Sequence, residues 1–206
     1  MKKISVLIAA FFVFACMAGA AYAQPQVDVA FGVGGVKAPS AFDVSSTNFD
    51  NSPQSVGGGT FLTLSGDFIF AKRLGVEMDA SFRANQNLYQ AFGNQQPFRP
   101  FFYNFNAIWA PTLGKRAEAE FLGGVGLQNT RFYTSNFTCS AFGCKNFVSS
   151  KHFLIDGGAG LKLYVKGNIF IRPEVRYNFV RNNLEFSGPT ALRYGVSLGY
   201  TLRSVK

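Results

Sequence analysis

After residue 26, apolar and polar residues alternate along the chain with a period of two rather than 3.6. This period is typical of β-strands, in which successive side chains point to opposite faces. Eight runs of about ten residues show the alternation, and a tilted strand of that length crosses a bilayer. The predicted strands are Val27–Lys37, Thr60–Phe70, Leu74–Asn85, Phe101–Ala110, Ala117–Asn129, Phe153–Val165, Ile169–Phe179 and Ala191–Leu202. The pattern therefore predicts an all-β fold, an eight-stranded antiparallel up-and-down transmembrane β-barrel.

One face of each predicted strand carries no charged residue, apart from Lys37 at the end of the first strand. In the third strand, for example, Val76 and Met78 alternate with Glu77 and Asp79. A charge at lipid depth costs about 2–4 kcal/mol, so contact between the apolar face and lipid predicts this absence. Pro173 is a misfit on the apolar face of the seventh strand. Because proline has no N–H to donate to a ladder, we expect a bulge or a local break there.

Charged and small residues collect on the opposite face of the strands. The charged residues are Asp28, Asp67, Glu77, Asp79, Arg83, Glu118, Glu120, Asp156, Lys162, Arg172, Glu174, Arg176 and Arg193. The glycines are Gly32, Gly34, Gly75, Gly124, Gly126, Gly158, Gly160, Gly195 and Gly199. An eight-stranded barrel has an interior just wide enough for side chains, and buried ions need partners. We therefore expect a closed lumen that is filled by an ion-paired charge network.

The connections between the predicted strands alternate between short and long. The short ones are residues 71–73, 111–116 and 166–168, and the long ones are 38–59, 86–100, 130–152 and 180–190. Outer-membrane barrels have short periplasmic turns and longer extracellular loops, so this alternation predicts four extracellular loops. Aromatic residues near both strand ends resemble interfacial girdles. They are Phe68, Phe70 and Trp109 near the short turns, and Phe31, Phe82, Phe101, Tyr103, Phe153 and Tyr177 near the long loops.

The N-terminus has the features of an export signal. Two lysines precede an apolar run that is too short to span a bilayer, and an A-x-A triplet ends at Ala23. These features predict a signal peptide over residues 1–23 and a mature barrel domain over residues 24–206. The alternatives are an N-terminal membrane anchor and a lipoprotein signal through Cys16.

The two cysteines of the mature chain lie close together in Cys139-Ser-Ala-Phe-Gly-Cys144. An exported chain meets an oxidising compartment, so we expect Cys139 and Cys144 to form a local disulfide. A metal site is the alternative, but two thiols without a nearby histidine or carboxylate make a poor one. We therefore expect neither a metal nor another cofactor.

The charge balance is basic and points to lipid. The formal net charge is +9, and loss of Lys2 and Lys3 with the signal would leave +7. An exported chain rarely meets nucleic acid, so phosphate-bearing headgroups are the expected counter-charge. We expect outer-membrane lipid and lipopolysaccharide as partners and no nucleic acid. A surface ligand, of unknown identity, is left open.

The architecture over residues 24–206 resembles the small bacterial outer-membrane β-barrels, the family of OmpX and the OmpA transmembrane domain. The last strand, Arg193-Tyr-Gly-Val-Ser-Leu-Gly-Tyr200, is similar to that family's terminal assembly signal. The resemblance implies a bacterial outer-membrane location and recognition by the barrel-assembly machinery. The chain departs from the family habit of a terminal aromatic, since six residues follow Tyr200. We also expect no peptidoglycan-binding domain after the barrel, so the resemblance does not imply a wall-tethering role.

A soluble lipocalin-like barrel is the rival fold. It also has strands with a period of two, but its apolar face is turned inward. The alternating loop lengths and the glycine-rich charged face favour lipid contact instead.

The sequence offers little catalytic chemistry, although some barrels of this size modify lipid A. His152 is the only histidine, and Ser149 and Ser150 lie near it. Asp156 shares its strand face but lies about 13 Å along the strand, too far for a Ser/His/acid site. We expect no catalytic residues and favour a structural or surface-interaction protein. A narrow pore or small-molecule conduit, and a lipid A-modifying enzyme, are the alternatives.

Overall fold

The computed structural model describes residues 25–39, 55–71, 73–91, 94–140, 143–186 and 188–203. The predicted signal peptide and Cys16 lie outside these residues. Within the described ranges, nine strands form one antiparallel sheet. They are β1 (Gln26–Lys37), β2 (Phe61–Ala71), β3 (Leu74–Arg83), β4 (Asn87–Ala91), β5 (Asn94–Trp109), β6 (Ala117–Ser140), β7 (Gly143–Lys166), β8 (Ile169–Val180) and β9 (Thr190–Arg203).

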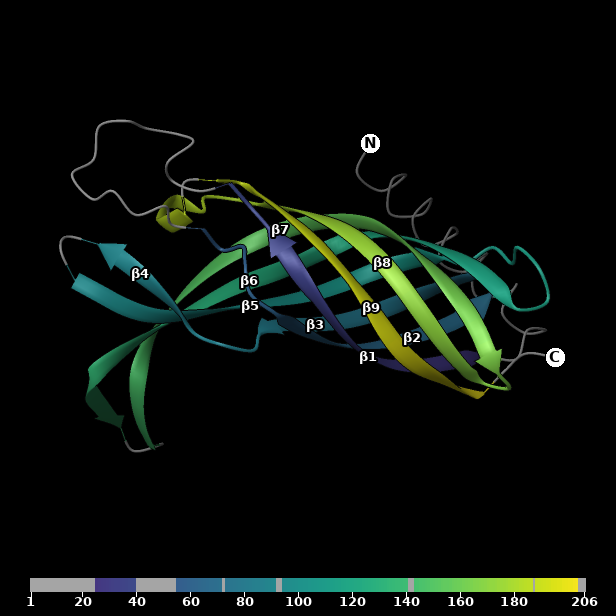
Figure 1. Cartoon of the computed structure of the whole chain (residues 1–206), viewed down its shortest axis with the longest axis horizontal. Helices are drawn as coiled ribbons and strands as arrows, with labels where there is room; N and C mark the ends of the chain where they lie inside the picture. The colour runs from purple at the N-terminus through teal and green to yellow at the C-terminus, as the bar shows by residue number, and fades with distance from the viewer. Residues whose placement is uncertain are drawn as a thin grey trace, which may run out of the picture.

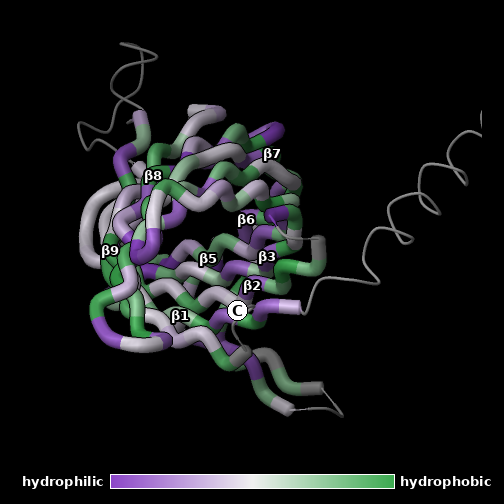
Figure 2. The backbone as a smooth tube through the Cα atoms, turned by 90° about the vertical axis from the view of Figure 1, so that its right-hand side faces the viewer, coloured by the Kyte–Doolittle hydropathy of each residue, from purple (hydrophilic) through white to green (hydrophobic). Residues whose placement is uncertain are grey.

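Eight of these strands close into a barrel. The sheet order is β3-β2-β1-β9-β8-β7-β6-β5-β4, and β3 also pairs with β5, which completes the ring. The short strand β4 pairs only with the start of β5 and projects from the ring. Figure 2 shows the eight remaining strands arranged around a common axis. The predicted eight-stranded antiparallel barrel is therefore confirmed, and β4 is an extra element. No helix in the described ranges is long and apolar enough to cross a membrane.

The two faces of the wall follow the predicted alternation. In β9, Tyr194 and Val196 are exposed on the outer wall, whereas Arg193 and Ser197 are buried inside. The alternating colours along the strands in Figure 2 reflect this pattern. Large apolar residues thus cover the outside of the barrel, and polar and charged residues fill it. This arrangement is the reverse of a lipocalin, whose apolar face is inside.

Two of the predicted long loops are instead strands. Residues 130–140 and 143–152 form the outer parts of β6 and β7, and residues 86–100 contain β4 and the start of β5. Their side chains alternate less clearly between apolar and polar, because a hairpin outside a bilayer needs no apolar face. The period-two pattern of hydrophobicity therefore ends before the strands do. Of the other two long loops, residues 180–190 hold a short 3₁₀ helix, η3 (Leu184–Phe186), and only the ends of 38–59 are described.

The two ends of the barrel differ in their connections. At one end, hereafter the turn end, β2–β3, β5–β6 and β7–β8 are joined by the predicted short turns. The β7–β8 turn places Gly167 at a φ of 55°, a left-handed conformation that glycine adopts without strain. At the other end, hereafter the hairpin end, lie β4, η3 and the outer parts of β6 and β7 (Figure 1).

Pro173 interrupts the ladder without producing a bulge. It pairs with Val196 of β9 in an unbroken register. On the other side, the pairing between β7 and β8 passes from Gly160–Glu174 to Leu163–Ile171 with no change of register and no pairs between them. The missing N–H of proline therefore causes a local gap in the ladder, and the alternative expectation of a bulge is wrong.

Candidate functional site: the filled lumen and its closure

An acidic wall and a basic wall face each other inside the barrel. Cross-strand register places Asp28 beside Asp67 and Asp67 beside Glu77, on three consecutive strands. Like charges opposite each other on a sheet are destabilising, so this row needs positive charge nearby. The bases are Lys162, Arg172, Arg176 and Arg193, which lie on β7, β8 and β9. In the ring, β7 and β8 lie opposite β2 and β3, whereas β9 adjoins β1.

Lys162 joins three carboxylates near the turn end. Its Nζ lies 2.5 Å from Asp28 Oδ2, 2.6 Å from Glu120 Oε1 and 3.6 Å from Asp67 Oδ2. The ammonium also lies 4.8 Å from the centroid of the Phe170 ring. The lysine side chain is fully buried, so these contacts replace its hydration.

Arg172 occupies the next level of the lumen. Its Nη1 lies 2.9 Å from Asp67 Oδ2 and 3.3 Å from Glu120 Oε2, and its Nη2 donates a 2.6 Å hydrogen bond to Ser65. Its Nε lies 3.3 Å from Glu174 Oε2. Arg172 thus links the acids held by Lys162 to those nearer the hairpin end.

Arg176 and Arg193 complete the network towards the hairpin end. Arg176 donates two hydrogen bonds to Glu77, of 2.8 and 2.6 Å, in the paired geometry that suits a guanidinium and a carboxylate. Its Nη2 also lies 2.9 Å from Glu174 Oε2. Arg193 donates a hydrogen bond to Asp79. The ion pairs therefore run through the lumen across facing walls.

Ten of the thirteen charged residues singled out in the sequence take part in these ion pairs, and three do not. Glu118, Asp156 and Arg83 have no ion pair among the described residues. Asp156 is buried, and neither of its carboxylate oxygens has a hydrogen-bond partner in the described structure. Arg83 is buried at the hairpin end, and its Nε and Nη1 also have no partner there.

An apolar cluster, which the sequence pattern did not predict, covers the ion pairs at the hairpin end. Its buried residues are Val36, Val56, Phe61, Phe98, Phe102, Leu154, Val180, Phe186 and Ala191. The helix η3 supplies Phe186, whose ring centroid lies 5.1 Å from that of Phe98 and 5.6 Å from that of Tyr89. Tyr89 also donates a 3.1 Å hydrogen bond to the carbonyl of Glu185. This cluster, the aromatic cap, packs η3 over the mouth of the barrel.

A smaller apolar layer lies on the other side of the ion pairs. Ile69, Ile108 and Ala110 form a buried cluster at the turn end. Phe170, which is also fully buried, contacts Lys162 from that side. The signal for both layers was present in the sequence as inward-facing apolar residues at the ends of strands, such as Phe61 and Ile69.

A serine, the only histidine and a glutamate meet at the edge of the aromatic cap. His152 Nε2 lies 2.9 Å from Ser150 Oγ and 2.9 Å from Glu185 Oε2, and the Ser150 hydroxyl donates to Glu185. Along the sequence Asp156 is the acid nearest to His152, whereas Glu185 is distant and lies in a predicted loop, so the sequence did not reveal this contact. In a catalytic triad the hydroxyl and the acid contact opposite ring nitrogens, whereas here both contact Nε2. The trio therefore fastens η3 to β7 and lacks the arrangement of a hydrolase.

The position of Glu185 affects its protonation. Burial alone would raise the pKa of its carboxyl group, but the hydrogen bond from Ser150 and the contacts with His152 outweigh burial and hold the pKa below its usual range. The carboxylate is therefore the form that the docked η3 favours.

The disulfide joins the outer parts of β6 and β7. Cys139 and Cys144 are directly paired in the β6–β7 register, and their sulfur atoms are bonded. The bond lies in the exposed part of the hairpin, beyond a register shift between Tyr133 and Thr138. It joins the part of the hairpin in which the described residues of β6 and β7 pair only with each other.

A closed ring of eight antiparallel strands, with an apolar outer wall and a charged interior, defines a transmembrane β-barrel of the outer-membrane type. Solved structures of small bacterial outer-membrane barrels share this fold. A major outer membrane protein from Thermus thermophilus superposes with a TM-score of 0.57 at 11% identity, over 87% of this chain and 100% of that one. Neisserial surface protein A gives 0.55 at 11% identity, over 85% of this chain and 96% of its own.

A third similar structure is that of Ail, the attachment invasion locus protein of Yersinia pestis, in complex with the heparin analogue sucrose octasulfate. It gives a TM-score of 0.52 at 15% identity, over 86% of this chain and 97% of that one. At these identities the likeness shows the fold alone. No protein-family model matches the chain, and no curated protein matches it in sequence.

Proposed function

We propose that this chain is an integral protein of a bacterial outer membrane, exported by a cleaved signal peptide over residues 1–23. Its mature barrel is closed and presents the hairpin end at the cell surface for a structural or surface-interaction role. The apolar outer wall and the fold shared with outer-membrane barrels support the location. The short turns, which lie in the periplasm of such barrels, support the orientation.

The order of the layers along the barrel axis is the observation that best supports a closed lumen. An apolar layer with Ile69 and Ile108, a network of ion pairs, and the aromatic cap follow one another. Arg172 and Arg176, each fully buried, are among the largest side chains in the interior. A barrel filled in this way leaves no continuous aqueous path, so we propose that it is not a pore.

Conductance measurements test this proposal against the alternative of a narrow conduit. We expect the folded chain, reconstituted in planar bilayers, to give no current steps above the bare membrane. The control is Glu77→Ala combined with Arg176→Ala, which removes both members of a buried pair and opens space without changing the net charge. We expect current steps from this variant only. Stable current steps from the unchanged chain would overturn the closed lumen.

We propose three classes of partner for the surfaces of the barrel. Lipid contacts the outer wall, and lipopolysaccharide surrounds the hairpin end. The barrel-assembly machinery recognises the final strand, in which Arg193 to Tyr200 is similar to an assembly signal. We propose no enzymatic activity, because Ser150, His152 and Glu185 meet in a geometry that does not suit nucleophilic catalysis.

A further inference from the structure

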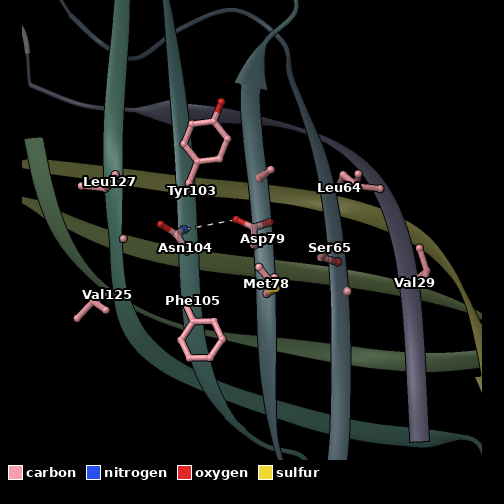
Figure 3. Close-up of a pocket in the computed structure, with 13 residues that line it drawn as sticks. Val29, Leu64, Ser65, Met78, Asp79, Tyr103, Asn104, Phe105, Val125 and Leu127 are labelled. Atoms are coloured by element: carbon pink, nitrogen blue, oxygen red, sulfur yellow. Dashed lines mark hydrogen bonds between the residues drawn. The ribbon is translucent and has the colours of Figure 1, made fainter. Parts of the chain in front are cut away.

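The outer wall of the barrel contains a hollow of about 580 Å³ that spans five strands. Two cross-strand rows line it on the outside. One row is Leu64, Ala80, Tyr103 and Leu127, and the other is Val29, Gly66, Met78, Phe105 and Val125. Figure 3 shows Tyr103 and Phe105 projecting from the same strand on either side of Asn104, whose amide donates to Asp79 of the lumen. The hollow forms because Gly66 and Ala80 are small while their neighbours are large.

Three basic residues lie on the outer wall between this hollow and the hairpin end. Arg99 of β5 is paired with Arg131 of β6, and Lys151 of β7 is paired with Asn129 one row closer to the hollow. Arg99 lies four residues from Tyr103 on the same strand, which corresponds to about 13 Å. Arg131 and Lys151 were predicted to lie in a loop, but the extended strands hold them on the same face as the hollow.

These three bases, hereafter the basic cluster, have no counter-charge within the described residues. The guanidinium of Arg131 lies 4.5 Å from the Phe101 ring centroid and 4.8 Å from that of Phe147, and it has no ion pair or hydrogen bond there. Within the described part of the chain, Arg99 donates only to the carbonyl of Ala84, at 3.1 Å. The described acidic residues face the lumen, apart from Glu185 in η3. An anion must therefore come from outside the chain.

We propose that the basic cluster and the hollow together bind a phosphorylated glycolipid of the lipid A type. Its phosphate groups contact Arg99, Arg131 and Lys151, and one of its acyl chains lies in the hollow. A planar guanidinium matches a phosphate group with two parallel hydrogen bonds, and the rings beside Arg131 hold it in place. The hollow is as large as many small-molecule sites and is lined almost entirely by apolar groups.

This site rests on the proposed orientation, in which the hairpin end lies at the outer leaflet. A glycolipid fits better than a phospholipid because the three positive charges lie within two neighbouring rows. Such a cluster favours a headgroup with more than one phosphate. The hollow next to the basic cluster spans several strands, so it can accept one acyl chain of a lipid that carries many acyl chains.

Native mass spectrometry of the folded full chain in detergent tests the site. The probes are bis-phosphorylated lipid A, mono-phosphorylated lipid A and phosphatidylglycerol, each titrated separately. We expect the bis-phosphorylated form to bind most tightly. Arg99→Gln combined with Arg131→Gln should raise its Kd by about tenfold or more, since one charge-assisted contact is worth roughly that factor. Arg131→Lys should keep part of the affinity. The matched control, Lys115→Gln combined with Arg116→Gln, removes two charges at the turn end and should leave the Kd unchanged.

The hollow is tested separately by filling it. A Cβ added at Gly66 meets no atom closer than 4.0 Å, so Gly66→Leu fits without a backbone shift. Gly123→Leu is the control, because Gly123 is exposed on the outer wall outside the hollow and a Cβ added there meets its nearest atom at 3.8 Å. We expect Gly66→Leu to raise the Kd for lipid A severalfold and Gly123→Leu to leave it unchanged.

Three outcomes would overturn the site. Equal binding of phosphatidylglycerol and lipid A would show that the site accepts any anionic headgroup and is not selective for a glycolipid. Unchanged Kd values in the Arg99 and Arg131 variant, whose folding is checked by its heat-modifiable gel shift, would remove the basic cluster. If the chain forms a dimer and Gly66→Leu abolishes it, the hollow would be a contact with a second copy of the chain and not a lipid site. The conductance of the barrel is independent of all three, so a failure here is distinguishable from a conducting lumen.

Discussion

Replacing Lys162 by methionine is expected to destabilise the barrel by about 3–5 kcal/mol. This is the usual cost of removing one partner from a buried ion pair. Methionine has a similar length and no charge, so the change isolates the electrostatic loss. The three carboxylates that contact Lys162 do not lose equally. Asp67 and Glu120 keep Arg172, at 2.9 and 3.3 Å. Among the described residues, Asp28 keeps only the amide of Gln26, which donates at 2.8 Å.

In Lys162→Met the uncompensated charge is therefore on Asp28, so a second substitution that removes this charge should restore stability. We expect Lys162→Met combined with Asp28→Asn to recover most of the lost stability, because the double variant buries no unpaired carboxylate at that position. Lys162→Met combined with Glu120→Gln should recover less, since Glu120 still has a cationic partner. The assay is urea-induced unfolding in lipid vesicles, followed by the gel shift between folded and unfolded forms. A loss below about 1 kcal/mol for Lys162→Met, or equal recovery by the two double variants, would refute the reasoning.

Three further predictions concern the wall, the hairpin and η3. Val196 is 49% exposed on the outer wall, so Val196→Arg should lower the yield of folded barrel by an amount matching about 2–4 kcal/mol. Asn136→Arg, on the exposed hairpin, should not lower it, and equal yields for the two variants would contradict the assigned faces. Cys139 and Cys144 should resist alkylation until a reductant is added. Reduction should lower the free energy of unfolding by less than the ~3 kcal/mol of a 15-residue loop, which unfolding of the oxidised and reduced forms would measure. Because the pKa of Glu185 is held below its ordinary 4.5, docking of η3 should weaken as the pH falls below that value, and limited proteolysis should show Glu185→Gln to lack this pH dependence.

Most of the outer wall could be predicted from the sequence because a single physical rule acts on every position that faces the apolar interior of the bilayer. A charge that faces lipid is costly, so the sequence of each strand indicates which residues face outward, as the alternation of Val76 and Glu77 does. The same rule stops at the membrane boundary. Residues 130–140 and 143–152 are strands in the structure, yet they needed no apolar face, and their alternation was too weak to separate them from a loop.

The contents of the lumen were predictable, but the pairings were not. The phase of the strands placed Lys162, Arg172 and Glu77 inside, whereas the partner of each depends on which strands face each other across the ring. The aromatic cap was missed for a related reason. Its members come from several strands and from η3, and Phe186 lies in a segment whose sequence resembles a polar loop.

The basic cluster illustrates how much of a surface is determined by register. Arg99 and Arg131 lie far apart in the sequence, and each alone is an ordinary boundary residue. Pairing of β5 with β6 makes them direct neighbours, and pairing of β6 with β7 adds Lys151. The described acidic residues of the strands point inward to balance the lumen, so none remains on the outer wall to neutralise these three. A filled, acidic lumen and an uncompensated basic exterior are thus two consequences of one alternating pattern. The excess positive charge of the chain falls where the headgroups of a surrounding membrane would lie.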